Sequence, residues 1–405
     1  MQNNPAVVSI VGVGEDGWEG LAAAARDVIE AAEVIVGSAR HLALVPPTGA
    51  EHITWPSPML PFVDRILEQR FWRNIVVLAS GDPMLCGVGA VFARRIDAAE
   101  LQVIPHVSSF ALACARLGWP SSETTLISMV NRPLERLHPH VQPGRRLIVF
   151  AQDGSTPRQV AELLVERGYG PSSMCVFEHL GGAREQRREA IAQAWEADRC
   201  ADLNLVAVLC KAHEGTRALA VVPGLPDDVY ESDGQLTKRE VRAATLARLV
   251  PLPGALLWDV GAGMGSIGIE WMRTHPTCRA VAFERHAART QSIVQNARRL
   301  GVPGLRVIAG SAPASFANME APDAIFIGGG IAADDLVAAG WAALSRGGRL
   351  VANVVTVEGE ATLAALQASF GGELVRFSIA RAEPVGALLG WRPMMPVTQW
   401  AITKS

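Results

Sequence analysis

The residues best suited to chemistry in this 405-residue chain are two acids with three glycines between them. Asp259 ends one short apolar run, Gly261, Gly263 and Gly265 follow it in alternation, and Glu284 ends the next apolar run. Glycines let a backbone approach a ligand closely, and the start of a following helix leaves N–H groups without partners. A glutamate at the end of the second strand could accept hydrogen bonds from two ribose hydroxyls. The pattern therefore predicts a turn that binds a nucleoside.

Two kinds of nucleoside ligand could use such a turn. A dinucleotide site requires GxGxxG followed by an acid, but Ser266 occupies the position of the third glycine. Asp259 would also bring a negative charge towards a pyrophosphate, whereas a cationic ligand would favour that charge. S-adenosylmethionine carries an ammonium, a sulfonium and a ribose, and it has no phosphate. The sequence favours a methyl-donor site, with a dinucleotide site and a purely structural glycine turn as the alternatives.

These residues are expected at the strand ends of a doubly wound α/β domain. Five strands alternate with helices, and two longer strands close the chain. The expected strands are 255–258, 280–283, 305–309, 323–327, 349–355, 373–380 and 393–403. This order predicts a seven-stranded Rossmann-like methyltransferase domain whose last two strands form an antiparallel hairpin.

The first half of the chain offers three further strand ends. A strand at 6–11 runs into Gly12 and Gly14, a strand at 74–78 breaks into Gly81-Asp82-Pro83, and a strand at 101–104 precedes Ser108-Ser109. Open α/β sheets bind ligands just beyond the carboxyl ends of their strands. Each loop could equally be a plain turn, and either serine could simply cap the helix that begins near Phe110.

Taken together, these segments resemble the tetrapyrrole (corrin and porphyrin) methylase family. The resemblance is carried by VSIVGVGEDG, by SGDP at 80–83 and by PHVSSF at 105–110, and it covers residues 5–212. It implies two small α/β lobes that enclose S-adenosylmethionine, with the tetrapyrrole in the cleft between them. The donor contacts that it implies are Gly12, Gly14, Gly81, Asp82, Pro83, Met84, Ser108 and Ser109.

One segment departs from that family's pattern. Where close relatives carry Ser-x-His-Gly-Arg, this chain has Val130 and Asn131 in place of His-Gly, between Ser128 and Arg132. Any catalytic role of that histidine is therefore absent here. No catalytic residue is assigned from the sequence.

The second half resembles the decarboxylating precorrin methyltransferases of the cobalamin pathway. The segments that match are TKREVRA, LLWDVGAGMGSIGIE, AFER, GSAP and DAIFIGGG, within residues 226–405. The donor contacts implied are Thr237, Asp259, Gly261, Ala262, Gly263, Met264, Gly265, Glu284, Ser311 and Ala312, with Gly328 and Gly329 facing the substrate. Thr237 and Glu240 also fit a capping box at the start of a helix that runs to Leu249.

The two resemblances together imply a bifunctional enzyme. The first domain would methylate carbon 5 of a precorrin, and the second would methylate carbon 15 and decarboxylate the ring C acetate, with one S-adenosylmethionine per domain and no metal. The alternatives are a methyltransferase acting on another tetrapyrrole, a small molecule or an RNA base, and a carrier with inactive sites. Glycines at 328–330, where amino-directed enzymes carry Asn-Pro-Pro-Tyr or Asp-Pro-Pro-Tyr, argue against an RNA base.

Such a substrate carries many carboxylates, so local arginines are expected to hold it. The candidates are Arg132, Arg184, Arg187 and Arg188 in the first half and Arg239 and Arg242 in the second. Each could instead be a solvated surface charge. Methyl transfer itself mainly requires that the two reactants be oriented and water be excluded, which can contribute ~7–11 kcal/mol.

Composition limits the remaining possibilities. The net charge of −3 predicts no general attraction to nucleic acid or membranes. Six scattered cysteines without a CxxC pair predict reduced, mostly buried thiols in a cytoplasmic protein. We expect a homo-oligomer. The expected domains are residues 1–213 and 236–405, joined by a linker at 214–235 that is rich in Pro, Gly and acids.

Overall fold

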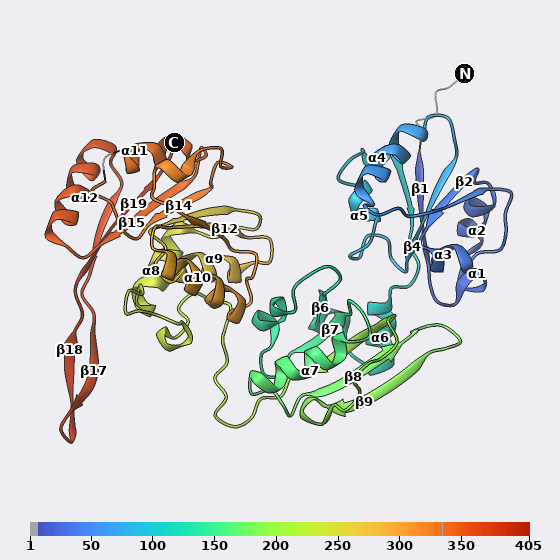
Figure 1. Ribbon diagram of the computed structural model, residues 1–405, viewed down its shortest axis with the longest axis horizontal. Coiled ribbons are helices and arrows are strands. Elements are labelled where there is room, and N and C mark those ends of the chain that lie inside the picture. The colour runs from blue at the N-terminus through green and yellow to red at the C-terminus, as the bar shows by residue number, and fades with distance from the viewer. Residues whose placement is uncertain (1–6, 334) are drawn as a thin grey trace. The chain divides into compact units, whose positions relative to one another are not determined.

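The computed structural model describes residues 7–333 and 335–405, and the chain forms two compact units (Figure 1). The first consists of Met1–Leu134 and His140–Thr216, and the second of Glu135–Pro139 and Arg217–Ser405. In the described part of the chain, no helix is long and apolar enough to cross a membrane.

The first unit begins with a five-stranded parallel sheet in the order β3-β2-β4-β1-β5. Every residue of β1 is buried, because this strand pairs with β4 and β5 and helices cover both faces of the sheet. The strands are β1 Val8–Val13, β2 Val34–Gly37, β3 Glu51–Thr54, β4 Ile75–Ser80 and β5 Leu101–Ile104. The helices are α1 Gly17–Gly20, α2 Ala23–Glu30, α3 Ala39–Ala43, α4 Leu60–Gln69 and α5 Gly89–Phe92.

A second sheet completes this unit, in the order β6-β7-β10-β8-β9. Only the β6–β7 pair is parallel; the other pairs are antiparallel. Its strands are β6 Thr124–Ser128, β7 Arg146–Phe150, β8 Ser173–Glu178, β9 Gln186–Ile191 and β10 Asn204–Leu209, with helices α6 Ser109–Leu117 and α7 Thr156–Glu166. The two α/β lobes expected for residues 5–212 are therefore present.

The second unit contains a seven-stranded sheet in the order β13-β12-β11-β14-β15-β19-β16. Its first five strands are parallel, and β19 is antiparallel to β15 and β16. This confirms the expected Rossmann-like layout. The strands are β11 Leu256–Val260, β12 Arg279–Glu284, β13 Arg306–Ala309, β14 Ala324–Ile327, β15 Arg349–Val354, β16 Glu373–Phe377 and β19 Val397–Thr403. The helices are α8 Arg239–Leu249, α9 Ser266–Thr274, α10 Ala287–Arg299, α11 Leu336–Ala343 and α12 Val357–Phe370.

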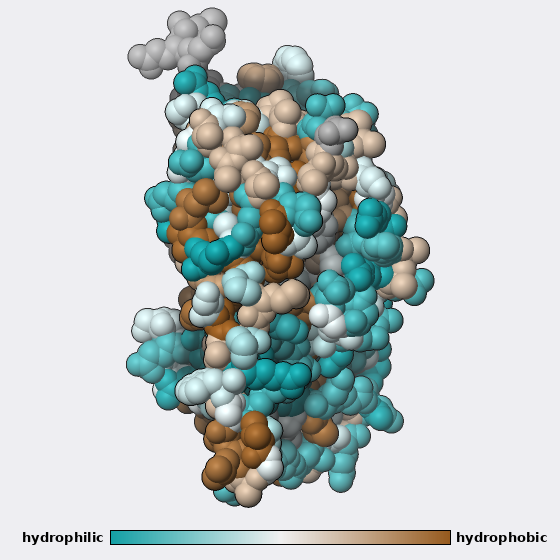
Figure 2. All heavy atoms as spheres, turned by 90° about the vertical axis from the view of Figure 1, so that its left-hand side faces the viewer, coloured by the Kyte–Doolittle hydropathy of each residue, from teal (hydrophilic) through white to brown (hydrophobic). Residues whose placement is uncertain are grey.

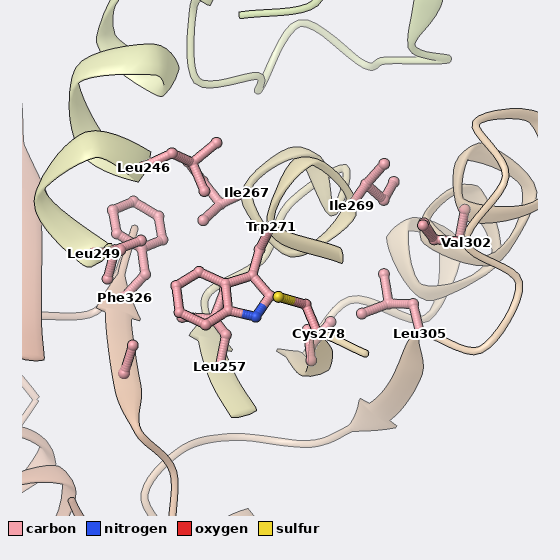
Figure 3. Packing of buried hydrophobic residues seen from close by; sticks show 14 of the residues in the cluster. Leu246, Leu249, Leu257, Ile267, Ile269, Trp271, Cys278, Val302, Leu305 and Phe326 are labelled. Atoms are coloured by element: carbon pink, nitrogen blue, oxygen red, sulfur yellow. The ribbon is translucent and has the colours of Figure 1, made fainter. Parts of the chain in front are cut away.

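Helix α9 is held over the sheet by a core cluster around Trp271. This side chain is fully buried and lies among leucines of α8 and the side chains of Val302 and Leu305 (Figure 3). Burying an aromatic side chain of this size contributes about 1.5–3 kcal/mol. Trp271 thus anchors α9, and the predicted glycine turn that leads into this helix, to the core of the unit.

The segment predicted as a linker is, from Arg217 onwards, part of the second unit. Leu225 and Tyr230 are 3% and 5% exposed and belong to the same core cluster as Trp271. The linker interpretation is therefore wrong for these residues. Pro and Gly made the stretch resemble a free connector, although single apolar side chains in it are buried.

One of two expected helix caps requires correction. Helix α8 begins after Lys238, without a side-chain cap, so Thr237 and Glu240 do not form a capping box. The Glu240 carboxylate instead accepts a hydrogen bond from Arg381 at 2.6 Å. By contrast, Ser108 does cap α6, because its hydroxyl accepts a hydrogen bond from the Ala111 N–H at 3.2 Å.

The connection between the last two strands of the sheet is a two-stranded ribbon of β17 Ala380–Val385 and β18 Leu388–Pro393. Val385 pairs with Leu388, so Gly386 and Ala387 form the two-residue turn, and Gly386 has φ +61° as such turns require. The sequence analysis expected strands at 373–380 and 393–403 only. It missed the ribbon because neither strand of it buries an apolar face.

Candidate active sites

The first unit contains a cavity of about 360 Å³. The ends of β1 and β4 line it, together with residues that follow β1, β2, β4 and β5, and β6, β7, β8 and β10 contribute residues from the second sheet. Of the predicted donor contacts, five lie on its wall: Gly14, Gly81, Asp82, Ser108 and Ser109. The strand-end argument thus led to a region where both lobes of this unit contribute to a hollow.

Gly12 does not line the cavity, and it has a structural role. A Cβ at this position would overlap the carbonyl oxygen of Gly81 and would lie 2.7 Å from the backbone nitrogen of His106. The His106 N–H donates to the Gly81 carbonyl at 3.1 Å, and the Gly81 N–H donates to the Val13 carbonyl at 3.0 Å. Gly12 therefore allows three backbone segments to meet behind the cavity wall.

Pro83 and Met84 are likewise absent from the cavity lining. Asp82 accepts a hydrogen bond from the Met84 N–H at 2.8 Å, which closes a tight turn. Pro83 is buried against Gly87 and Gly89, while Met84 is 46% exposed. These residues shape the loop that presents Gly81 and Asp82.

The sequence analysis missed a polar cluster on the cavity wall, made of Glu15, Arg40, His41 and Ser80. Arg40 forms an ion pair with Glu15, and its Nη2 donates to Ser80 Oγ at 2.8 Å. His41 Nε2 lies 2.8 Å from Arg40 Nη2 and 2.9 Å from Ser80 Oγ. The available signal was the Arg-His pair that follows strand β2, at the same edge of the sheet as the glycine loops.

The arginines predicted to hold substrate in the first unit do not line this cavity. Arg184 is exposed, and its Nη2 lies 3.4 Å from His179 Nδ1. Arg132 is exposed next to Asn131, which has φ +54°. Val130, at the position of the missing histidine, does line the cavity.

In the second unit, the backbone of the predicted glycine turn is left-handed at all three alternate glycines. Gly261, Gly263 and Gly265 have backbone φ angles of +69°, +58° and +77°, values that residues other than glycine rarely adopt. A Cβ on Gly261 would lie 2.9 Å from the Gly329 nitrogen, so the loops after β11 and β14 touch at their backbones. The turn is thus a shallow backbone cradle at the carboxyl ends of the central strands.

Glu284 stabilises this glycine turn by a hydrogen bond to its backbone. It is 4% exposed, and its carboxylate accepts hydrogen bonds from the Gly263 N–H and the His286 N–H, both at 2.9 Å. The two bonds leave acceptor capacity on both oxygens. A role towards ribose hydroxyls therefore stays a prediction, beside the structural role found here.

Asp259 lies beneath helix α9 and does not face open solvent. It is 1% exposed, its Oδ2 accepts from the Gly268 N–H at 2.9 Å, and its Oδ1 has no partner in the described structure. Burial, assisted by the nearby charge of Glu284, raises the pKa of Asp259 to about 7. This carboxyl is therefore poised between its neutral and charged forms near neutral pH, and a cationic ligand would favour the charged form.

We expect Asp259→Asn to remove a pH-dependent loss of stability. Because the pKa is raised on folding, from 3.8 to about 7, the folded chain holds a proton that the unfolded chain releases between these values. Stability from this group is therefore highest at acid pH and falls as pH rises through that window, by on the order of 4 kcal/mol. Calorimetric unfolding of the intact chain at about pH 5 and about pH 8 should show that the stability of the variant relative to the parent rises from the lower pH to the higher. An equal loss of stability at both pH values would contradict this.

The other predicted residues of this unit differ in their surroundings. Met264 is 2% exposed, and its backbone carbonyl accepts a hydrogen bond from the Asn296 side chain. Its observed polar contact is therefore made by the backbone. Ser311 is exposed, and Ala312 packs against a core cluster that contains Trp258 and Phe283. Arg239 is exposed and lines a surface hollow with Arg217 and Arg381.

Arg242 cannot bind substrate in this structure. It is fully buried, and its guanidinium donates to Glu270 at 2.6 Å, to Asp227 at 3.2 Å and to the carbonyls of Thr237 and Leu225. The expectation for Arg242 is therefore wrong. A sequence shows the charge of such an arginine but not the acid that it meets 28 positions away.

Comparisons with known proteins cover both units. Residues 7–194 match the family described as Tetrapyrrole (Corrin/Porphyrin) Methylases, and residues 228–404 match the Precorrin methyltransferase domain. The chain is 47% identical over 408 residues to the precorrin-6Y C(5,15)-methyltransferase [decarboxylating] of a Sinorhizobium species, covering 99% of this chain and 98% of the relative. It is 44% identical to the protein of that name from Mycobacterium tuberculosis (strain CDC 1551 / Oshkosh), covering 98% and 100%.

Among solved structures, the C-terminal domain of precorrin-6Y C5,15-methyltransferase from Rhodobacter capsulatus is 42% identical. The match covers 46% of this chain and 100% of that one, with a TM-score of 0.44.

Proposed function

The chain belongs to the precorrin-6Y C(5,15)-methyltransferase (decarboxylating) family, and we infer from this that it methylates carbons 5 and 15 of precorrin-6Y. The methyl groups come from two molecules of S-adenosyl-L-methionine, and the ring C acetate loses carbon dioxide to give precorrin-8. The observation that carries this inference is the 47% sequence identity to the Sinorhizobium relative, along almost the whole length of both proteins. Both units, and not one alone, lie within the matched length.

We propose that each unit binds one donor molecule and that the two units divide the chemistry. The N-terminal cavity, with Gly14, Gly81 and Ser108 on its wall, would serve methylation of carbon 5. The cradle of Gly261, Gly263 and Glu284 would serve methylation of carbon 15 and decarboxylation. In support, both places lie at the carboxyl ends of parallel strands, and at both a glycine permits close backbone approach.

The donor fits both places by its chemistry. In the second unit, Glu284 retains lone pairs for ribose hydroxyls, and Asp259 Oδ1 is a buried acceptor without a partner, to which a nearby positive charge is favourable. In the first unit, the cavity wall is mostly apolar, with backbone and hydroxyl groups from the Gly81 and Ser108 loops. When bound, the donor supplies the methyl group.

The protein's part in the reaction is to orient and to exclude water. The precorrin ring is electron-rich and attacks the methyl carbon in line with the departing sulfur, so no activated serine or cysteine is needed. Holding two reactants in that geometry can contribute ~7–11 kcal/mol. Loss of carbon dioxide is favoured by desolvating the acetate carboxylate next to a conjugated imine of the ring. We retain Arg132, Arg184 and Arg239, and the backbone of Gly328 and Gly329, as candidates that hold the substrate's periphery.

The proposed function is tested with purified intact chain, hydrogenated precorrin and donor labelled in its methyl group. We expect two labelled methyl groups in the product for each carbon dioxide released, and mass spectrometry of the product measures both. Transfer without release of carbon dioxide, or transfer to other tetrapyrroles only, would mean a methyltransferase with a different substrate. A product without label would contradict the proposal.

We also propose that the chain forms homo-oligomers through the β17–β18 ribbon. Its large apolar side chains are strongly exposed in a single chain, with Leu388 at 78%, Leu389 at 73% and Trp391 at 78%. Figure 2 shows hydrophobic side chains at the end of this ribbon, at the bottom of the view. Exposed apolar patches of this kind mark sites of protein association, and a second copy offers the same surface by symmetry.

We place the enzyme in the cytoplasm as part of the same proposal. All six cysteines are free, and five of them are buried. Reduced thiols of this kind are typical of a reducing compartment.

A further inference from the structure

One cluster of polar groups on the wall of the N-terminal cavity is joined by hydrogen bonds around Arg40. Most of the wall is apolar, and among the described residues that line it Arg40 is the only arginine or lysine. Arg40 lies in helix α3, which follows β2 in the chain, and Glu15 and Ser80 reach it from the ends of β1 and β4. None of these residues was selected from the sequence.

The guanidinium of Arg40 is fixed in place before any ligand arrives. Nη1 donates to Glu15, and Nη2 donates to Ser80 Oγ and to His41 Nε2, both at 2.8 Å. A guanidinium has five N–H groups, so these three bonds leave two for a ligand. Its side chain remains 34% exposed. A charged group that is held but not enclosed can bind without first losing rotamer freedom.

His41 contributes no charge to this site. Arginine only donates hydrogen bonds, so His41 Nε2 must be the acceptor and its proton must sit on Nδ1. Burial, with a smaller contribution from Arg40, lowers the pKa of His41 to about 4, in agreement with a neutral ring. His41 is 8% exposed, and the Nδ1 donor has no partner in the described structure.

Arg40 is the positive group that an anionic ligand would meet on the described part of the cavity wall. Glu15 also faces His179, whose Nδ1 lies 3.4 Å from Glu15 Oε2 and 3.4 Å from Arg184 Nη2. The described cavity wall carries two carboxylates, Glu15 and Asp82, beside this one guanidinium, so an anion would be held by the directed N–H groups of Arg40 and not by an excess of positive charge. The anion that guanidinium binds best in a fixed geometry is a carboxylate or a phosphate, and neither the methyl donor nor a precorrin carries phosphate.

We propose that Arg40 binds a ligand carboxylate in the N-terminal cavity, with Glu15 and Ser80 as the residues that position it. The proposal rests on the proposed function, which brings two ligands with carboxylates to this cavity. One is the amino-acid end of the methyl donor, and the other is an acetate or propionate chain of the tetrapyrrole. Both offer the same chemistry to Arg40, so experiment must separate them.

The test uses equilibrium binding to intact Arg40→Met, which keeps the length of the side chain and removes its charge. Loss of a hydrogen bond to a charged group should weaken binding at least ~10-fold. If Arg40 binds the donor's carboxylate, the variant should bind S-adenosylhomocysteine more weakly at one of its sites. Binding of 5′-methylthioadenosine, which lacks the amino-acid part, should be unchanged. If Arg40 binds the tetrapyrrole's carboxylate, the variant should bind the hydrogenated precorrin more weakly, and its binding of S-adenosylhomocysteine should be unchanged.

Arg95→Met is the matched control, because Arg95 is 30% exposed, pairs with one acid, Asp64, and lies outside the cavity lining. It should bind both ligands as the parent does. If Arg40→Met does not fold, Arg40→Lys serves instead, since it keeps the charge and loses the fork that reaches both Glu15 and Ser80. Unchanged binding of both ligands overturns the role of Arg40. Failure of the parent chain to methylate carbon 5 would instead count against the proposed function, and it leaves these binding measurements valid.

Discussion

Replacing Glu270 by alanine is expected to destabilise the second unit by about 3–5 kcal/mol. Glu270 is 1% exposed and accepts hydrogen bonds from Arg242 Nε at 2.6 Å, from Tyr230 Oη at 2.8 Å, and from the backbone N–H groups of Gly224 and Leu225. Its removal leaves a buried guanidinium without its closest acid and three further donors without an acceptor. Burial and the Glu270 charge also hold the pKa of Tyr230 well above its ordinary value, so the phenol stays a donor.

The matched control is Glu373→Ala. Glu373 pairs with Arg248 at 2.7 Å, but both side chains are exposed, so its removal should cost less than about 1 kcal/mol. Calorimetric unfolding of the intact chain measures both changes, because the first unit provides an internal reference transition. A Glu270→Ala transition that moves no further than that of Glu373→Ala would show that the cluster does not stabilise the unit.

This cluster also explains why the extent of the second unit could not be predicted. Glu270 lies on α9, Arg242 on α8, and Gly224, Leu225 and Tyr230 in the stretch expected to be a linker. Nothing in the composition of that stretch indicates that a buried carboxylate more than forty positions away holds its backbone. Such a contact is a property of the folded chain, whereas apolar periodicity is a property of a short segment.

Local patterns were sufficient where one strand or one turn decided the structure. The apolar runs before Gly12 and Asp259 became the buried strands β1 and β11, and the alternate glycines became a turn with three positive φ angles. Strand ends in turn located the cavity through Gly81 and Ser108. The sequence therefore predicted the backbone of both candidate sites.

Side-chain roles were predicted less well, because they depend on which neighbours meet. Arg242 and Arg40 look alike in the sequence, yet the first is fully buried against Glu270 and the second is one-third exposed in a cavity. Asp259 was expected to face a ligand, and it lies under α9. The ribbon of β17 and β18 was missed because its apolar residues are exposed and do not pack into a core of the chain.

The largest effect on activity is expected from Gly12→Val, which should reduce methylation of carbon 5 by at least ~100-fold. A side chain there overlaps the Gly81 carbonyl and approaches the His106 backbone, so the loop that carries Gly81 and Asp82 must move away from β1. A displacement of about 1 Å in a site that works by orientation can cost this much. The second unit is untouched by this change. The product should therefore carry one new methyl group and lack the ring C carboxyl group.

Gly261→Val is the complementary change, because its side chain would lie 2.9 Å from the Gly329 nitrogen on a backbone with φ +69°. It should leave the acetate of precorrin-6Y intact and suppress transfer to carbon 15. Gly49→Ala and Gly304→Ala control for the loss of a glycine in each unit, since a Cβ meets nothing within 4 Å at the first and only Met272 at 3.9 Å at the second. Mass spectrometry of the products separates the two variants. A Gly12→Val product with both methyl groups, or one that keeps its acetate, would mean that the two units do not divide the reaction as proposed.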